Sequence, residues 1–313
     1  IAIQSYALVG RMFRVLVDLD WGVYHNGADP RRESIELGQR TLHPQDEIQG
    51  ARQPLIQVST EPLHIKTGEI IAQKGDGPWY EPLFSDGRNN TGLICDVPGA
   101  VNDHHYHPDF NEFWVILKGE LEFEIGDYPV LHAGEGDIVR APVGERHLIR
   151  TVGAESSVRL HVSKIGSNHD NKRDRGSEIA PFPDQTEPPN LLHTTLNGVI
   201  EQKGEPQWVS SVIQDALNTA NLIYSAPGTP YNAHWHPDFD EWWTILQGQL
   251  TWDLGEKRPI CHVKRGDIMF VPRGLKHYIL THGDENSFRL AITDSEGLHV
   301  YQEGDQDAPP PRE

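Results

Sequence analysis

The sequence predicts an all-β fold of two tandem barrels that follow an N-terminal extension. The first observation behind this prediction is a long internal repeat. The second is a regular succession of short apolar runs separated by turn residues, and the third is a histidine-rich motif found at the same place in both copies. Because self-similarity at a fixed spacing marks a duplicated structural unit, the repeat defines the domain organisation.

The repeat keeps its register through most of each copy. Both copies carry the segments Leu-His, Gln-Lys-Gly, Pro-Gly and Gly-Asp-Ile in the same order. The offset is 129 residues as far as Gly126 and Gly255 and 130 residues beyond them, so the second copy has one extra residue in that turn. A register of this length indicates a tandem duplication.

Short β runs make up each copy. In the first copy we expect strands at residues 92–97, 112–117, 120–125, 137–141 and 147–152. Gly, Pro, Asn and Asp separate these runs at a spacing of roughly eight to twelve residues, which is typical of an all-β barrel or sandwich.

The remaining segments differ in composition from the repeats. Residues 1–62 have no counterpart in the second copy, and we expect them to form an extension that packs on the barrels. The segment between the copies is polar and lacks periodicity, as a linker would. The sequence thus predicts an extension at 1–62, a first barrel at 63–163, a linker at 164–191, a second barrel at 192–300 and a disordered tail at 301–313.

Composition narrows the functional class of the protein. The formal net charge of −19 argues against a nucleic-acid partner, which a basic surface would favour. No apolar run approaches the length of a membrane span, so we expect no membrane association. The two cysteines, Cys95 and Cys261, occupy unmatched positions and resemble buried apolar residues more than a disulfide framework. These observations favour a cytoplasmic protein.

One motif carries chemistry, and it occurs twice. His105 and His107 are separated by one residue, which places both side chains on one face of a strand, and Glu112 follows closely. His234, His236 and Glu241 repeat the arrangement. Each copy therefore offers three metal ligands. A single buried histidine is usually a hydrogen-bonded core residue, but the repeated pattern favours metal binding.

The motif resembles a known family. Gly99-x5-His105-x-His107-x4-Glu112-x6-Gly119, followed by Gly136-x5-Pro142-x-Gly144-x2-His147, resembles the two motifs of the cupin superfamily. The second copy repeats both motifs, so the chain resembles a bicupin over residues 63–163 and 192–293. The resemblance implies two jelly-roll (double-stranded β-helix) barrels. It also implies two metal sites, formed by His105, His107, Glu112 and His147 and by His234, His236, Glu241 and His277.

Imidazole and carboxylate ligands suit several divalent transition metals. They bind Fe, Mn, Ni, Cu, Co or Zn, and the ligand types alone do not rank these ions. Four protein ligands in an octahedral site leave two positions open for water, dioxygen or a substrate. We expect Fe(II) or Mn(II), and a closed tetrahedral zinc site is the structural alternative.

Strand parity identifies candidate substrate residues beside the ligands. Residues two positions apart on a strand share a face, which places four apolar side chains beside the expected metal ions: Trp114, Ile149, Trp243 and Ile279. These tryptophans would stack on a planar substrate or fill the barrel core. Arg140 is replaced by Phe270 in the second copy. If this position lines the cavity, the first site would bind an anion and the second an apolar group; a solvent-facing Arg and a packed Phe are the alternative. The matched Arg159 and Arg289 are expected to form structural ion pairs.

The resemblance implies an enzymatic function. Flavonol-type dioxygenases of the superfamily use three His and one Glu, so the chain is expected to be a dioxygenase. Its substrate would be a small aromatic or enolisable carboxylate compound, with dioxygen as the co-substrate and Glu112 or Glu241 as the general base.

Other functions remain open at this point. A redox-metal decarboxylase resembling oxalate decarboxylase is the first alternative, and a metal-dependent isomerase or lyase is the next. A non-catalytic bicupin that binds a metal or ligand belongs to another class, and oxygen consumption would separate it from the leading interpretation. Association into a homo-oligomer is also expected, because cupin barrels commonly associate with one another.

Overall fold

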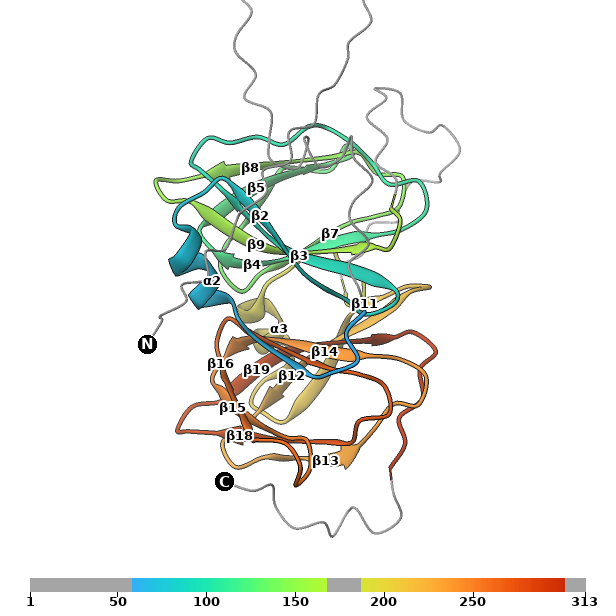
Figure 1. Ribbon diagram of the computed structural model, residues 1–313. Coiled ribbons are helices and arrows are strands. Elements are labelled where there is room, and N and C mark those ends of the chain that lie inside the picture. The colour runs from blue at the N-terminus through green and yellow to red at the C-terminus, as the bar shows by residue number, and fades with distance from the viewer. Residues whose placement is uncertain (1–57, 168–186, 302–313) are drawn as a thin grey trace, which may run out of the picture. The chain divides into compact units, whose positions relative to one another are not determined.

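The computed structural model describes residues 58–167 and 187–301. These residues belong to one compact unit, in which two short helices accompany two sets of β-sheets (Figure 1). The predicted all-β jelly-roll fold is therefore confirmed. Residues 1–57 of the expected extension, 168–186 of the linker and 302–313 of the tail lie outside the described residues. The domain boundaries given above stay a prediction.

The first barrel contains a six-stranded and a three-stranded sheet. The larger sheet has the order β10 (His193–Thr194), β7 (Ile138–Ala141), β4 (Glu112–Lys118), β9 (Ser157–Lys164), β3 (Asn89–Asp96), β2 (Trp79–Ser85). The smaller sheet has the order β6 (Leu131–Ala133), β5 (Glu120–Ile125), β8 (His147–Val152). The strands predicted at 120–125 and 147–152 thus have the expected bounds.

The second barrel repeats this arrangement. Its six-stranded sheet has the order β1 (Leu63–Lys66), β17 (Asp267–Val271), β14 (Glu241–Gln247), β19 (Ser287–Asp294), β12 (Asn218–Ser225), β11 (Trp208–Gln214). Its four-stranded sheet has the order β13 (Pro230–His234), β18 (His277–His282), β15 (Gln249–Asp253), β16 (Cys261–Lys264). The two helices are α2 (Thr67–Lys74) and α3 (Leu196–Lys203).

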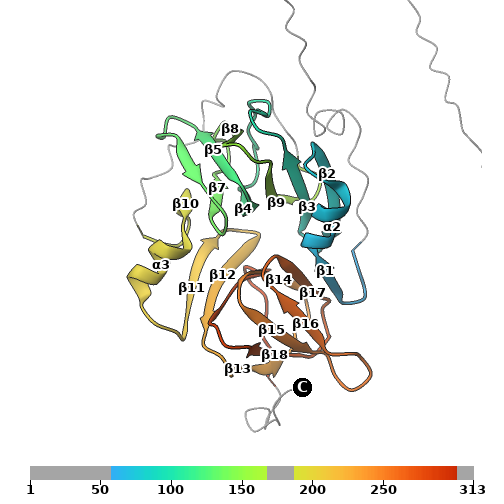
Figure 2. The same cartoon turned by 90° about the vertical axis from the view of Figure 1, so that its left-hand side faces the viewer.

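The leading strand of each repeat belongs to the sheet of the other repeat. β1 pairs antiparallel with β17, and β10 pairs antiparallel with β7 (Figure 2). The matched histidines of these two strands secure the exchange, since His64 Nε2 lies 2.8 Å from Asp267 Oδ2 and His193 Nε2 lies 2.9 Å from Asp137 Oδ2. The exchange joins the two barrels through backbone hydrogen bonds as well as side chains.

The burial of the strands shows which sheet faces are covered. All eight residues of β3 are buried, whereas β8 alternates between buried and half-buried positions. A strand buried on both faces needs a partner layer on each side. For the six-stranded sheets, one layer is the barrel interior and the other is an apolar core with residues from both repeats, among them Phe113, Leu160, Trp242 and Phe270.

The interior of each barrel holds a separate apolar core. In the first barrel this core includes Trp114, Phe123 and Ile149, and in the second it includes Trp243 and Ile279. Within the described residues, no helix is long and apolar enough to cross a membrane. Both cysteines are free: Cys95 is buried and Cys261 is half-buried.

Candidate metal centres

The first predicted ligand set comes together inside the first barrel. The ligand atoms of His105, His107, Glu112 and His147 all lie within 4.8 Å of one another, and all four residues are buried. Glu112 is the first residue of β4 and His147 the first of β8, while His105 forms a β-bridge with His147. The sheet pairing therefore brings a sequence-distant histidine to the His-x-His motif.

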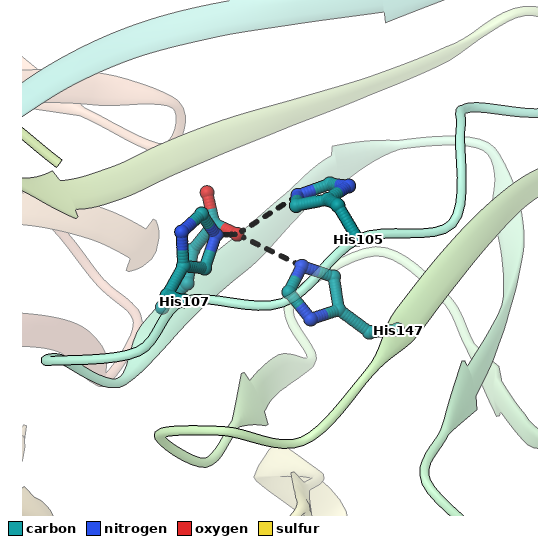
Figure 3. Close-up of side chains that lie close together, drawn as sticks. His105, His107 and His147 are labelled. Atoms are coloured by element: carbon teal, nitrogen blue, oxygen red, sulfur yellow. Dashed lines mark hydrogen bonds and ion pairs between the residues drawn. The ribbon is translucent and has the colours of Figure 1, made fainter. Parts of the chain in front are cut away.

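One carboxylate oxygen is the centre of this cluster. Glu112 Oε2 lies 2.7 Å from Nε2 of His107, 3.1 Å from Nε2 of His147 and 4.0 Å from Nε2 of His105. Figure 3 shows the three imidazoles converging on that oxygen.

The second set has the same arrangement in the second barrel. The ligand atoms of His234, His236, Glu241 and His277 also lie within 4.8 Å of one another, and all four residues are buried. Glu241 Oε2 lies 2.5 Å from Nε2 of His236, 3.4 Å from Nε2 of His277 and 3.8 Å from Nε2 of His234. His277 Nε2 is buried without a hydrogen-bond partner among the described residues.

Backbone carbonyls orient the imidazoles. In the first barrel, Nδ1 of His105 lies 2.8 Å from the Asp103 carbonyl and Nδ1 of His147 lies 3.1 Å from the Glu145 carbonyl. The same contact is made by three histidines of the second barrel: His234 to Asn232 at 2.8 Å, His236 to Leu298 at 3.1 Å and His277 to Leu275 at 3.1 Å. A carbonyl only accepts, so Nδ1 carries the hydrogen and Nε2 directs its lone pair into the cluster.

This donor set fits a divalent metal ion. If no cation lay among them, an imidazole such as His147 or His236 would have to be doubly protonated to bond both a carbonyl and the carboxylate. Buried imidazolium ions are costly, and the Nε2 lone pairs of the remaining imidazoles would face the cluster without a partner. A divalent ion lets the imidazoles stay neutral and satisfies their lone pairs and the carboxylate together. Each cluster is therefore suited to hold one ion.

Both carboxylates are held ionised. Burial alone would raise the pKa of Glu112, yet the charge of His107 and the close contacts with His107, His147 and His161 hold that pKa well below its usual value. Burial likewise opposes ionisation of Glu241, and the close contacts with His234, His236 and His277 lower its pKa well below the usual value. An ionised carboxylate is the form that binds a metal.

Four of the predicted substrate residues lie beside the clusters. The ring of Trp114 is 5.3 Å from that of His147, and the ring of Trp243 is 5.2 Å from that of His277, in each case edge to face. Ile149 and Ile279 are buried in the same barrel cores as these tryptophans. These four side chains give each cluster an apolar wall.

The structure places Arg140 and Phe270 on the opposite face of their sheets. Arg140 lies opposite Phe113 in the sheet, and Phe113 points away from the face that carries Glu112. The Nη2 of Arg140 donates to the Asn190 carbonyl at 2.6 Å. Phe270 belongs to the core between the repeats, and the centre of its ring lies 5.0 Å from the centre of the Phe84 ring. Since residues of opposite parity leave a strand on opposite faces, neither side chain accompanies the metal ligands, and neither enters the substrate site proposed below.

His161 belongs to the first cluster although the motif did not include it. His161 Nε2 lies 2.7 Å from Oε1 of Glu112, the oxygen that does not face His107. Nδ1 of His161 is buried without a hydrogen-bond partner among the described residues. The matched residue of the second barrel is Ala291. This difference between otherwise similar copies is the signal in the sequence that could have identified His161.

The second cluster has an additional aromatic border. The ring of His299 lies 4.4 Å from that of His236, and the ring of Tyr301 lies 5.4 Å from that of His234. Val300 forms a β-bridge with Trp235, which holds this C-terminal segment against the motif. On another side, the ring of Tyr231 lies 5.6 Å from that of His234. His299 and Tyr301 are exposed, so the border reaches the surface.

Comparison with known proteins agrees with this architecture. The Cupin domain family matches residues 92–163 and 221–294. The curated relative "Polyketide synthase CurC" of Streptomyces cyaneus is 34% identical over 76 residues, which cover 24% of this chain and 48% of that protein. The chain thus spans about half the length of this relative.

Solved structures with the same fold include enzymes. A salicylate 1,2-dioxygenase from Pseudaminobacter salicylatoxidans has a TM-score of 0.61 at 12% identity, over 80% of this chain and 91% of its own. A variant of oxalate decarboxylase from Bacillus subtilis has a TM-score of 0.51 at 17% identity, over 82% of this chain and 84% of its own. At these identities the likeness shows the fold alone.

Each half of the chain therefore carries a cupin domain match, and each barrel surrounds one cluster of three histidines and one glutamate. The order of the strands and the position of the ligands agree between the two halves. The chain belongs to the cupin superfamily and is a bicupin.

Proposed function

We propose that this bicupin is a metal-dependent dioxygenase that acts on a small aromatic or enolisable carboxylate compound. The observation that supports it most is the pair of complete three-histidine, one-glutamate clusters, in which backbone carbonyls turn every Nε2 but that of His107 toward the carboxylate.

The ion itself would be Fe(II) or Mn(II). Either metal, when bound, supplies a route for electrons between an organic substrate and dioxygen, which redox-inert zinc does not. Four protein ligands would leave positions on a six-coordinate ion open to small molecules. These positions are the reason to propose catalysis rather than a closed structural site.

The side chains around each cluster have separate roles in this proposal. Trp114 and Ile149 in the first barrel, and Trp243 and Ile279 in the second, keep water away from the ligands. Glu112 or Glu241 would act as the general base by accepting a proton from the substrate.

The substrate class follows from the surroundings and from the relatives. A solved variant of the salicylate dioxygenase is described in complex with gentisate, an aromatic carboxylate. In this chain, aromatic side chains border the second cluster, which suits a planar molecule. Salicylate, gentisate and related compounds are therefore the first substrates to test.

The test compares oxygen uptake with release of carbon dioxide. The protein is loaded with Fe(II) or Mn(II) and given salicylate, gentisate or oxalate, and the His107→Ala, His236→Ala double variant is the control. A dioxygenase consumes oxygen in proportion to substrate loss, and the double variant does not. Loss of substrate without net oxygen uptake would contradict this proposal.

A decarboxylase is the second candidate function. The presence of two intact clusters supports it, because the resemblance to oxalate decarboxylase also involves two full metal sites. The same experiment separates the two: a decarboxylase releases carbon dioxide and formate from oxalate with no stoichiometric consumption of oxygen.

A further inference from the structure

Arg289 is a buried guanidinium in the second barrel without a carboxylate partner among the described residues. Its side chain is 1% exposed, and its Nη1 donates to the Ser225 hydroxyl at 3.3 Å. Its guanidinium also lies over the ring of Tyr231, 5.4 Å from the ring centre. Nε has no hydrogen-bond partner in the described part of the chain. One hydroxyl and one aromatic face are a weak environment for a full positive charge.

The matched arginine of the first barrel has a different partner. Arg159 Nη1 donates to Asp96 Oδ2 at 2.7 Å, and both side chains are buried. Ser225 occupies the position in the second copy that Asp96 occupies in the first. Arg159 therefore forms the ion pair expected from the sequence, whereas Arg289 forms none with the residues that the structure describes, contrary to the expectation.

An unpaired charge of this kind calls for a counter-ion. Burial lowers the pKa of Arg289 to about 10, against the charges of Tyr231 and Glu241, which raise it, so the guanidinium still carries its charge at neutral pH. Buried charges in proteins are normally paired, because an isolated ion loses its hydration without compensation. Guanidinium groups bind carboxylates through two parallel hydrogen bonds. The position thus has the chemistry of a carboxylate receptor.

The position lies on the ligand side of the sheet. Arg289 on β19 pairs with Ile245 on β14, which shares its face with Trp243 and Glu241. Tyr231 lies between the guanidinium and the metal cluster, since its ring contacts both Arg289 and His234. A small molecule with a carboxylate on Arg289 would therefore extend past Tyr231 toward the four ligands.

We propose that Arg289 is the carboxylate receptor of the second barrel and that this barrel binds a small aromatic carboxylate. Tyr231 contacts the guanidinium, and the rings of Tyr231 and Tyr301 both lie beside that of His234, so they would supply ring faces for the aromatic part. The first barrel has no such receptor, because Asp96 occupies Arg159. This inference rests on the proposed function, for which it names the substrate class and the barrel.

The test measures binding without turnover. The metal-loaded protein carries His107→Ala, which removes the first cluster, and is titrated anaerobically with salicylate, gentisate and benzoate in a calorimeter. Salicylamide is the uncharged control ligand. We expect at least one carboxylate to bind, and salicylamide to bind about ten- to hundred-fold more weakly, as loss of a charged hydrogen-bonded pair implies.

Two substitutions at Ser225 distinguish charge from volume. Ser225→Asp copies the first barrel and gives Arg289 an internal partner, so the dissociation constant should rise by about ten-fold or more. The asparagine of Ser225→Asn has nearly the volume of an aspartate but no charge, so this variant should bind the carboxylate as tightly as the parent does. Equal affinities for both variants, or no preference for carboxylate over amide, would overturn the proposal.

Thermal unfolding without ligand gives a second readout. Arg289→Met removes an unpaired buried charge and should leave the melting temperature unchanged or higher, whereas Arg159→Met orphans Asp96 and should lower it. A large decrease for Arg289→Met would show a structural role instead and overturn the proposal. If the protein binds carboxylates through Arg289 but consumes no oxygen, the proposed role of Arg289 is upheld and the proposed dioxygenase function is contradicted. Failure of one proposal can therefore be told from failure of the other.

Discussion

His161 Nε2 lies 2.7 Å from Oε1 of Glu112, while Oε2 of the same carboxylate faces the three ligand histidines. The imidazole thereby restricts rotation of the carboxylate and keeps one oxygen directed at the ion. Ala291 at the matched position of the second barrel leaves Glu241 without this contact. The two clusters thus share their ligands but differ in how firmly the glutamate is held.

This contact leads to the first prediction, which concerns metal affinity. His161→Ala should weaken metal binding by the first cluster by about ten- to hundred-fold, because a residue that orients a ligand contributes that much. The measurement is a Mn(II) titration followed by electron paramagnetic resonance, in a background with His236→Ala so that the first cluster alone is loaded.

His161→Gln is the matched control, since its amide can still donate to Oε1 of Glu112. It should recover most of the affinity and the parent spectrum. If the alanine and glutamine variants bind Mn(II) equally well, His161 has no orienting role.

The second prediction concerns the number of bound ions. The parent protein should bind two divalent ions per chain, His107→Ala and His236→Ala one each, and the double variant none. Elemental analysis after dialysis measures the ratio. Removal of the metal by a chelator should also lower the melting temperature, because an ion that binds only the folded state stabilises it. An unchanged metal content in either single variant would exclude that cluster.

The third prediction concerns the contact between the repeats. Asn89 Nδ2 donates to Asn218 Oδ1 at 2.7 Å, and Asn218 Nδ2 donates back to Asn89 Oδ1 at 3.0 Å. Both side chains are buried, so Asn89→Ala leaves an amide unsatisfied and should cost about 1–3 kcal/mol of unfolding free energy. Denaturation in urea measures this loss.

Two further variants interpret that loss. Asn197→Ala changes an exposed asparagine of α3 and should alter stability by less than about 0.5 kcal/mol. The double variant of Asn89 and Asn218 should lose less than the sum of the single losses, because the pair acts as one unit. Strict additivity would show that the two amides contribute independently.

The fourth prediction concerns the segment that borders the second cluster. A Cβ at Gly297 would clash with the ring of Phe239, so Gly297→Ala must displace the segment or the ring. The displacement should break the contact between the Leu298 carbonyl and His236 Nδ1, and metal affinity of the second cluster should fall by about ten-fold.

The control for this variant is Gly134→Ala, where an added Cβ meets no atom within 4 Å. A metal titration of both variants in the His107→Ala background makes the comparison. Should Gly297→Ala bind metal like the control, the segment does not support His236.

Much of the architecture was predictable because local sequence patterns determine where strands and turns form. Alternating apolar residues and the turns between them locate strands such as β5 and β8 without any knowledge of the fold. The eight candidate metal ligands were predictable for a related reason: the copies repeat them in register, and a chance pattern would not be duplicated. The structure brings each set of four together as expected.

Other features depend on contacts between distant segments. The sequence does not reveal that β1 pairs with β17 and β10 with β7, because pairing partners follow from packing rather than from local propensity. The position of Arg140 was open for the same reason. Its strand is buried on both faces, so alternation could not tell the barrel interior from the layer between the repeats.

By itself, then, the sequence determined a duplicated β protein with two sets of three imidazoles and one carboxylate, since repetition and strand parity are local properties. The tertiary structure alone decided that His161 contacts Glu112, that Asp96 neutralises Arg159 and that Arg289 has no carboxylate partner within residues 58–167 and 187–301. These differences arise where single residues from separate strands meet in a buried space. There the identity of one neighbour decides whether a charge is paired or remains available to a ligand.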